Sequence, residues 1–427
     1  MSSSELGEAY KAVRYIPLSY NPAESNTSAL RLILTLFPEW GHPGGNVEFV
    51  RFTDGITNTL LKAVNKRPGL SDKQIDEEAV LLRAYGKGTD VLIDRKRESK
   101  SHCTLSHYNL APPLLARFDN GLLYRFIRGR VCSPSDLGEE KVWRGVARRL
   151  GEWHGVLPVV SVDEEVVNEN TRQGLLMQLS AQSPSETDLT NRQAISDISP
   201  CSVRPNIWTV MQKWIFALPS STSEENLRRA TLQRELRRLV RELGNTKGLG
   251  SGGLVFGHCD LLSGNVIVQP HTDGKPPTDN VETVSFIDYE YATPSPAAFD
   301  ICNHFAEWGG FDCDYNLMPT RSVRRGFLRE YLRSYKHHNR LHSATEGEDA
   351  EIQRLFEEVD LFRGVPGFYW GIWALIQATI SQIDFDYAAY AEVRLGEYWA
   401  WRAEVEGTRE AEGKEVPLRE KKWSQEV

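Results

Sequence analysis

The chain has 427 residues, of which 40% are hydrophobic and 25% charged, enough apolar material for one or two globular domains. Its 50 Lys and Arg against 58 Asp and Glu give a formal net charge of -8, which argues against nucleic acid as a partner. The first residues lack the basic segment and apolar run of a secretory signal, so we expect a cytoplasmic protein. The six scattered cysteines include no CxxC pair, so we expect free thiols and no closed zinc site.

The first 128 residues favour a sheet-rich N-terminal lobe. Helical spacing over 27–37 ends at Pro38, and strand patterns follow at 47–52, 59–64 and 79–84. Two further strand patterns, at 114–118 and 122–127, surround an Asp-Asn-Gly turn that suits a tight hairpin.

The period changes to a helical one near residue 139, which predicts a larger helical lobe over 129–401. Residues 162–204 are polar and predict a mobile surface insertion. Helical patterns return at 208–218 and 224–243, and the uncharged stretch 364–383 is expected to form a buried helix rather than a membrane span. The charged residues 402–427 are expected to form a frayed helix or tail.

Two common nucleotide-binding motifs are excluded. The run GLGSGG at 248–253 satisfies GxGxxG, but it follows a helical pattern and precedes a strand pattern, the reverse of the dinucleotide-binding context. The sequence contains no GxxxxGK[ST] run, which excludes a Walker-type phosphate loop.

The strongest chemical signal is the run LVFGHCDLLSGNVIV at 254–268, which reads HxDLxxxN. In kinase catalytic loops this spacing places the Asp where it can accept a hydroxyl proton, while the Asn binds a metal ion on the nucleotide phosphates. A second apolar strand ends at Asp288, where the kinase arrangement needs another metal-binding carboxylate. A turn capped by Asp and Asn explains the first motif alone but not the pair. We therefore expect Asp260 as the base, Asn265 and Asp288 as Mg2+ ligands, and His258 as the loop residue that orients Asp260.

Three segments, FGHCDLLSGNVIV, FIDYEYATPSPAAFDICNHFAEW and FYWGIWALIQATIS, resemble choline/ethanolamine kinases, and the similarity runs from about 46 to 398. Within that family, VRFTDGITNTLLKA, DVLIDR, FDNGLLYRFI and NHFAEWGGFDCDYNLMP resemble the ethanolamine kinase branch. The resemblance implies a two-lobed, protein-kinase-like α+β fold with a small sheet-rich N-lobe and a larger helical C-lobe. It also implies ATP and Mg2+ as cosubstrates and ethanolamine phosphorylation on the route to phosphatidylethanolamine.

The same resemblance assigns a nucleotide side to the site. The expected residues belong to a phosphate-covering loop, a strand arginine and the hinge: Asp54, Gly55, Thr57, Asn58, Arg83, Phe126 and Ile127. A plain hairpin turn is the alternative for the loop, and Lys62 is a weaker competitor of Arg83. Glu98 is either the partner of Arg83 or part of a surface salt bridge. Arg125 stands where the branch would have Glu, which puts the adenine-side contacts in question.

On the substrate side, an ammonium ion needs carboxylates and aromatic faces around it. The resemblance implies Glu307, Trp370, Trp373 and Tyr390 for this role. Ordinary core packing is the alternative for the aromatic residues, because Trp370 and Trp373 lie three apart on one helical face.

Several alternatives stay open at this point. Choline, or both amines, can be the acceptor, and other small-molecule kinases of the same fold act on aminoglycosides or sugars. A non-catalytic nucleotide-binding scaffold is the alternative from another class. We expect no nucleic-acid partner and no stable membrane insertion, and we leave a homodimer open.

Overall fold

The structure is a computed structural model that describes residues 10–52, 58–86, 88–159, 205–271, 278–339 and 347–427. The expected insertion at 162–204 and most of the predicted phosphate loop, including Asp54, Gly55 and Thr57, therefore lie outside the described residues.

The N-terminal part is a six-stranded sheet with the strand order β1-β5-β6-β4-β3-β2, in which the β1–β5 pair is parallel and the other pairs are antiparallel. The strands are β1 (Arg14–Ile16), β2 (Asn46–Phe52), β3 (Asn58–Lys66), β4 (Val80–Tyr85), β5 (Leu114–Phe118) and β6 (Gly121–Arg125). Apolar residues of α2 (Ser25–Leu36) pack with the buried side chains of the sheet in one core. The five strands predicted from the sequence are therefore present as β2 to β6.

A short helix between β3 and β4, α3 (Asp72–Glu78), was not expected. It begins with a capping box between Ser71 and Gln74. Gly121 lets β6 approach β4 closely, because a Cβ atom there would meet the carbonyl oxygen of Arg83 at 2.1 Å. A larger residue at Gly121 would displace the strand that carries Arg83.

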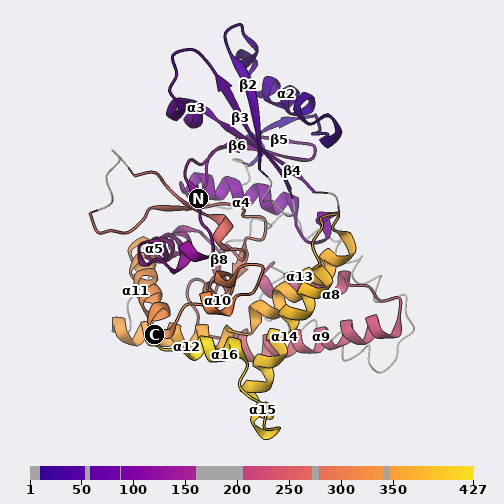
Figure 1. The fold of residues 1–427 in the computed structure, drawn as a ribbon, viewed down its shortest axis with the longest axis vertical. Coiled ribbons are helices and arrows are strands. Elements are labelled where there is room, and N and C mark those ends of the chain that lie inside the picture. Colours follow the sequence, from indigo (N-terminus) through magenta and orange to yellow (C-terminus); the bar gives the residue numbers. More distant parts are fainter. Residues whose placement is uncertain (1–9, 53–57, 87, 160–204, 272–277, 340–346) are drawn as a thin grey trace.

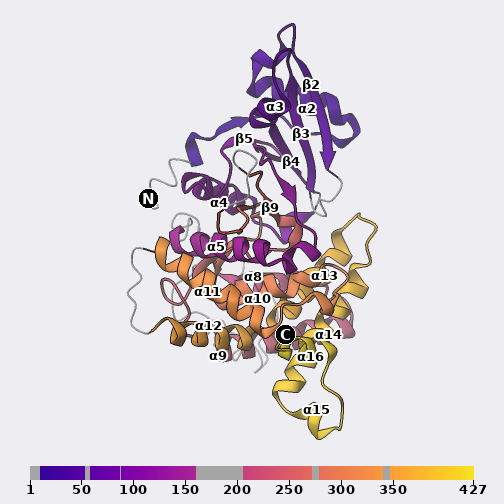
Figure 2. The same cartoon turned by 60° about the vertical axis from the view of Figure 1, so that its left-hand side comes forward.

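Helix α4 (Arg95–His107) lies between the sheet and the helical part in both views of the ribbon (Figures 1 and 2). Asp94 caps its N-terminus by accepting hydrogen bonds from Lys96 N and Arg97 N. Its Leu105 belongs to the core of the helical part, while polar residues such as Glu98 are also buried. Because α4 contacts both parts, the boundary expected at residue 128 stays a prediction.

Most of the remaining chain is helical. Its long helices are α5 (Glu140–Val156), α8 (Ile207–Ala217), α9 (Ser223–Leu243), α10 (Ala297–Ala306), α11 (Arg321–His338), α12 (Glu348–Phe362), α13 (Val365–Ile380) and α14 (Tyr387–Val405). Helix α13 is buried along most of its length, as the sequence predicts. Among the described residues, no helix is both long and apolar enough to cross a membrane.

Two small sheets hold the loops that carry the chemical motifs. One has the order β10 (Val284–Phe286), β9 (Val266–Val268), β7 (Arg130–Val131), and the other pairs β11 (Thr293–Ser295) with β8 (Val255–Gly257). Residues 258–265 connect β8 to β9, and residues 287–292 connect β10 to β11. Pairing of β9 with β10 and of β8 with β11 brings the two loops side by side.

The segment 402–427 was expected to be a frayed helix or tail; it is helical, but the expectation that it is frayed is wrong. Helix α14 continues through Arg402 to Val405, and α16 (Leu418–Ser424) packs back onto the helical part with Trp423 only 3% exposed. The buried Arg324 guanidinium stacks on the Trp423 ring at 4.0 Å and donates to the Trp423 carbonyl oxygen. Three charged residues of this segment, Arg402, Arg419 and Glu420, are buried in ion pairs, which the composition alone does not reveal.

Candidate active site

The loop after β8 is fixed by Asp300 of α10. Its Oδ1 accepts from Cys259 N at 2.7 Å and its Oδ2 from His258 N at 2.9 Å. Cys259 has φ 63°, a left-handed conformation that costs free energy in a non-glycine residue. Burial opposes ionisation of Asp300, but the interactions with His154 and the loop amides keep its pKa below the ordinary value. An ionised Asp300 therefore holds the loop, a role that the sequence did not reveal.

His258 is fully buried, and its Nε2 atom lies 3.0 Å from the carbonyl oxygen of Ile287. Burial lowers the pKa of His258 to about 4, so the ring is neutral at physiological pH. The ring ties the loop that carries Asp260 to the residue that precedes Asp288. His258 therefore connects the two loops.

Asp260 and Asn265 lie in direct contact. The Asn265 amide donates to the Asp260 carbonyl oxygen at 2.7 Å and to its Oδ2 at 3.2 Å. Asp260 is 7% exposed, and its pKa is raised well above the ordinary value by burial and by the negative charges of Asp288, Glu307 and Glu290. The charges of these three carboxylates therefore disfavour ionisation of Asp260.

Asp288 faces Arg83, with its Oδ1 2.6 Å from the guanidinium NH2. Burial raises the pKa of Asp288 to about 6, although Arg83 opposes the rise. In the described part of the chain no group of three or more His, Cys, Asp or Glu side chains could hold a metal ion. Mg2+, however, uses one or two carboxylates together with substrate phosphates. The Asp288 carboxylate and the amide oxygen of Asn265 are hard oxygen donors of that kind, so these residues fit Mg2+.

Arg83 of β4 is the centre of a buried ionic cluster. It contacts Glu290 and lies 3.6 Å from Glu98 of α4, and both glutamates are almost fully buried. A second arginine, Arg95, lies 3.1 Å from each of the same two glutamates. Asn58, at the start of β3, donates to Glu290 at 3.1 Å. Glu98 is therefore the partner of Arg83, and the surface salt bridge considered as its alternative is wrong.

Other residues expected on the nucleotide side lie around the hinge after β6. Phe126 is half-buried, stacks on Phe52 with ring centroids 6.3 Å apart, and carries the Lys62 ammonium 4.1 Å above its ring. Lys62 also pairs with Asp76 of α3, so its charge is directed away from Arg83. Arg125 donates to the carbonyl oxygen of Glu78. Ile127, the residue after Phe126, is half-buried.

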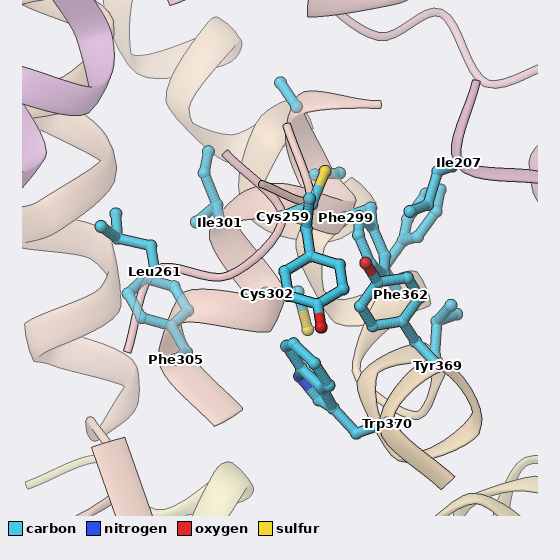
Figure 3. Packing of buried hydrophobic residues seen from close by; sticks show 14 of the residues in the cluster. Ile207, Cys259, Leu261, Phe299, Ile301, Cys302, Phe305, Phe362, Tyr369 and Trp370 are labelled. Atoms are coloured by element: carbon cyan, nitrogen blue, oxygen red, sulfur yellow. The ribbon is translucent and has the colours of Figure 1, made fainter. Parts of the chain in front are cut away.

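Two tryptophans of α13 are linked to the loops at 258–265 and 287–292, Trp370 through Asn303 and Trp373 through Tyr291. Trp370 Nε1 donates to Asn303 Oδ1 at 2.9 Å, and Asn303 donates to the Cys259 carbonyl oxygen at 3.1 Å. Trp373 Nε1 donates to the Tyr291 hydroxyl at 2.8 Å, a tyrosine whose pKa is raised by burial and by charges that include Asp260. Figure 3 shows Trp370 projecting from α13 into the buried cluster around Cys259. Trp370 and Trp373, named the aromatic wall below, therefore belong to the core and are hydrogen-bonded toward the two loops.

The two other residues expected to bind the acceptor are Tyr390 of α14 and Glu307, which follows α10. Tyr390 is 7% exposed and packs against Phe311 and Phe385, with centroid distances of 5.9 and 5.6 Å. Glu307, just after α10, is ion-paired with Arg394 of α14 at 2.9 Å. Sequence reasoning missed Arg394, because nothing in its helix marks it as buried.

The fold defines a class of protein. A sheet-rich N-terminal part and a larger helical part, with Asp260, Asn265, Asp288 and Arg83 on the elements between them, form a protein-kinase-like α+β fold. The choline/ethanolamine kinase model matches residues 49–399. The chain belongs to the choline/ethanolamine kinase family, and it is a small-molecule kinase.

Individual relatives agree with this assignment. The chain is 32% identical to ethanolamine kinase 1 of Mus musculus, over 88% of this chain and 89% of the relative. It is 31% identical to a probable ethanolamine kinase of Arabidopsis thaliana, over 86% and 83% of the two chains.

Solved structures show the same fold. An ethanolamine kinase of Plasmodium vivax superposes with a TM-score of 0.63 at 24% identity, covering 93% of this chain and 94% of that one. A choline kinase of Cryptosporidium parvum superposes with a TM-score of 0.59 at 20% identity, covering 90% and 97%.

Proposed function

We propose that the chain transfers the γ-phosphoryl group of ATP to the hydroxyl of ethanolamine. The observation that carries the proposal is the position of Asp260. Its carboxylate accepts from Asn265, and the charges of Asp288 and Glu307 raise its pKa. Its loop is linked through Asn303 to Trp370 of the aromatic wall. Relatives named ethanolamine kinase support the choice of amine.

In the proposed reaction, Asp260 orients the hydroxyl and accepts its proton as the new O–Pγ bond forms. The bond from Pγ to the β-phosphate oxygen breaks, and ADP leaves. Arg83 is placed to neutralise phosphate charge from its strand. Asn265 and Asp288 would hold Mg2+, which would neutralise the charge that develops on the phosphates.

The amine end of the acceptor would lie against Glu307 and the indole rings of Trp370 and Trp373. A primary ammonium ion donates hydrogen bonds to carboxylates, which a quaternary ammonium cannot do. Choline is the second candidate, because indole faces also attract a quaternary ammonium.

We further propose that the reaction takes place in the cytoplasm and supplies phosphoethanolamine for phosphatidylethanolamine synthesis. We also propose that residues 1–128 form the nucleotide-binding lobe and residues 129–401 the catalytic and acceptor-binding lobe. The loop with Asp54, Gly55 and Thr57 would cover the phosphates. Self-association as a homodimer is tested by measuring the mass of the purified protein in solution.

The test is ADP release by the purified chain with ATP and Mg2+, comparing ethanolamine, choline and no acceptor. Ethanolamine should stimulate release most strongly, and Asp260→Asn should lower the turnover number by about a hundredfold or more. The control, Asp279→Asn, changes an exposed carboxylate that pairs with Arg148 and should leave turnover unchanged.

The outcomes separate the alternatives. A stronger response to choline would move the assignment to choline phosphorylation. Turnover of a folded Asp260→Asn variant within about tenfold of the wild type would contradict the role of Asp260. ATP binding without turnover on either amine would favour the non-catalytic scaffold.

A further inference from the structure

Helix α16 lies beyond the family match, which ends at residue 399, yet it reaches the acceptor side of the site. It packs beside α14 in both ribbon views (Figures 1 and 2). Its Arg419 is only 4% exposed, although most of the side chains around it in the sequence are those of a surface helix. A buried arginine in this position needs anionic partners.

Those partners form a chain of ion pairs that ends at Glu307. Arg419 Nε lies 3.9 Å from Glu397 Oε2, and the same oxygen lies 3.4 Å from Arg394 Nε. Arg394 NH2 then lies 2.9 Å from Glu307 Oε1. All four side chains are at most 5% exposed, so water screens these charges poorly.

The positive and negative charges along this row of ion pairs are equal in number. On the far side of Arg419, Glu420 lies 3.3 Å from Arg419 and 2.7 Å from Arg363. The complete set alternates three carboxylates with three guanidinium groups: Glu307, Arg394, Glu397, Arg419, Glu420 and Arg363. Removal of one member of a buried pair leaves its partner uncompensated, so the remaining groups must rearrange.

The influence of Arg419 extends to Glu307 itself. Burial raises the pKa of Glu307, and the positive charges of Arg394 and of Arg419 oppose that rise. Glu307 in turn contributes to the negative field at Asp260. The C-terminal helix is therefore electrically connected to the acceptor end of the site.

We propose that Arg419 is a positioning residue for the acceptor: by sharing Glu397 with Arg394, it balances the pull of Glu397 on Arg394, which holds Glu307 in place. The inference rests on the proposed function, in which Glu307 faces the ammonium group. Without Arg419, Glu397 draws Arg394 toward itself, and Glu307 loses the partner that fixes it. Without Glu397, Arg394 pairs with Glu307 alone and competes with the ammonium group for that carboxylate. The acceptor amine then binds more weakly, whereas ATP, which binds on the Arg83 side, is unaffected.

The experiment is a charge-balanced double-variant cycle in the full chain. Arg419→Met and Glu397→Gln each unbalance the chain in opposite directions, and each should raise the KM for ethanolamine about fivefold or more while the KM for ATP stays within about twofold. The double variant Arg419→Met/Glu397→Gln restores the balance and should return the ethanolamine KM to within about twofold of the wild type. Arg419→Lys keeps the charge and should do the same.

The matched control is Lys421→Met, which removes one positive charge from the exposed face of the same helix, where Lys421 pairs with Glu415. It should leave both KM values unchanged. If Arg419→Met does not fold, Glu397→Gln, the double variant and Arg419→Lys still decide the question.

The proposal is overturned by an unchanged ethanolamine KM in both single variants, by a parallel rise in the ATP KM, or by a double variant that is no better than the single ones. A wild type without amine-stimulated turnover would refute the proposed function and this inference together. An active wild type with indifferent variants would refute this inference alone.

Discussion

Replacement of Asp300 by Asn should weaken both the fold and the catalytic loop. Asp300 Oδ1 and Oδ2 accept from two successive backbone amides, at 2.7 and 2.9 Å, and Oδ2 also lies 2.9 Å from His154 Nε2. An Asn side chain has one acceptor oxygen, so its amide group must point its own hydrogens at a backbone N–H or at His154.

The cost can be worked out from these contacts. Loss of one charge-assisted hydrogen bond costs about 1.5–3 kcal/mol, and a buried donor left unsatisfied costs about 1–3 kcal/mol more. The sum is about 2.5–6 kcal/mol. The same two hydrogen bonds also offset the strain of the left-handed conformation of Cys259, which costs about 1–3 kcal/mol. We therefore expect Asp300→Asn to lower the Tm by several degrees and the turnover number by about tenfold or more.

Thermal unfolding followed by tryptophan fluorescence gives the Tm, and ADP release gives the turnover number. Asp314→Asn is the control, because Asp314 accepts from Asn316 N on the surface and Asn is an equally good cap. A Tm within about one degree of the wild type together with unchanged turnover would show that Asp300 does not hold the loop.

Three further predictions follow from the site. Arg83→Met should lower kcat/KM for ATP by about a hundredfold or more, whereas Lys62→Met should change it little, and steady-state kinetics would expose similar losses in both as a wrong assignment. Trp373→Leu should raise the KM for ethanolamine by about tenfold by removing a cation–π contact, and an unchanged KM would restrict Trp373 to core packing. The raised pKa of Asp288, about 6, means that this carboxylate becomes protonated as the pH falls through that value. Mg2+ must then compete with protons, so the apparent KM for Mg2+ should rise with falling pH and level off above the pKa; a flat profile would exclude Asp288 as a ligand.

The fold was predictable where the sequence has a clear period. The strand patterns at 47–52 and 114–118 and the apolar helix at 364–383 coincide closely with β2, β5 and α13. Helix α3 was missed because its seven residues, DKQIDEE, contain a single apolar side chain and no buried face. The tail was misjudged because burial of Arg419 depends on carboxylates that are distant in the sequence.

The site was predictable where its residues lie close together in the chain. Asp260 and Asn265 share one loop, so their spacing alone indicates their contact. Glu290 was overlooked even though it stands two residues after Asp288, because its partners Arg83 and Asn58 are 207 and 232 positions away. Asp300 and Arg394 were missed for the same reason: a single charged residue on a helix gives no sign of the partner that buries it.

The contact between Arg83 and Asp288 has a consequence for the proposed binding of ATP. In the proposed reaction, Arg83 would contact a phosphate and Asp288 a metal ion, yet in this structure they neutralise each other at 2.6 Å. Arg83 would therefore exchange one anion for another, with a phosphate in place of the carboxylate, and Asp288 would exchange the guanidinium for a metal cation. Such a counter-ion exchange would leave both charges compensated before and after, so the site would admit a highly charged ligand without leaving a bare charge in a buried environment.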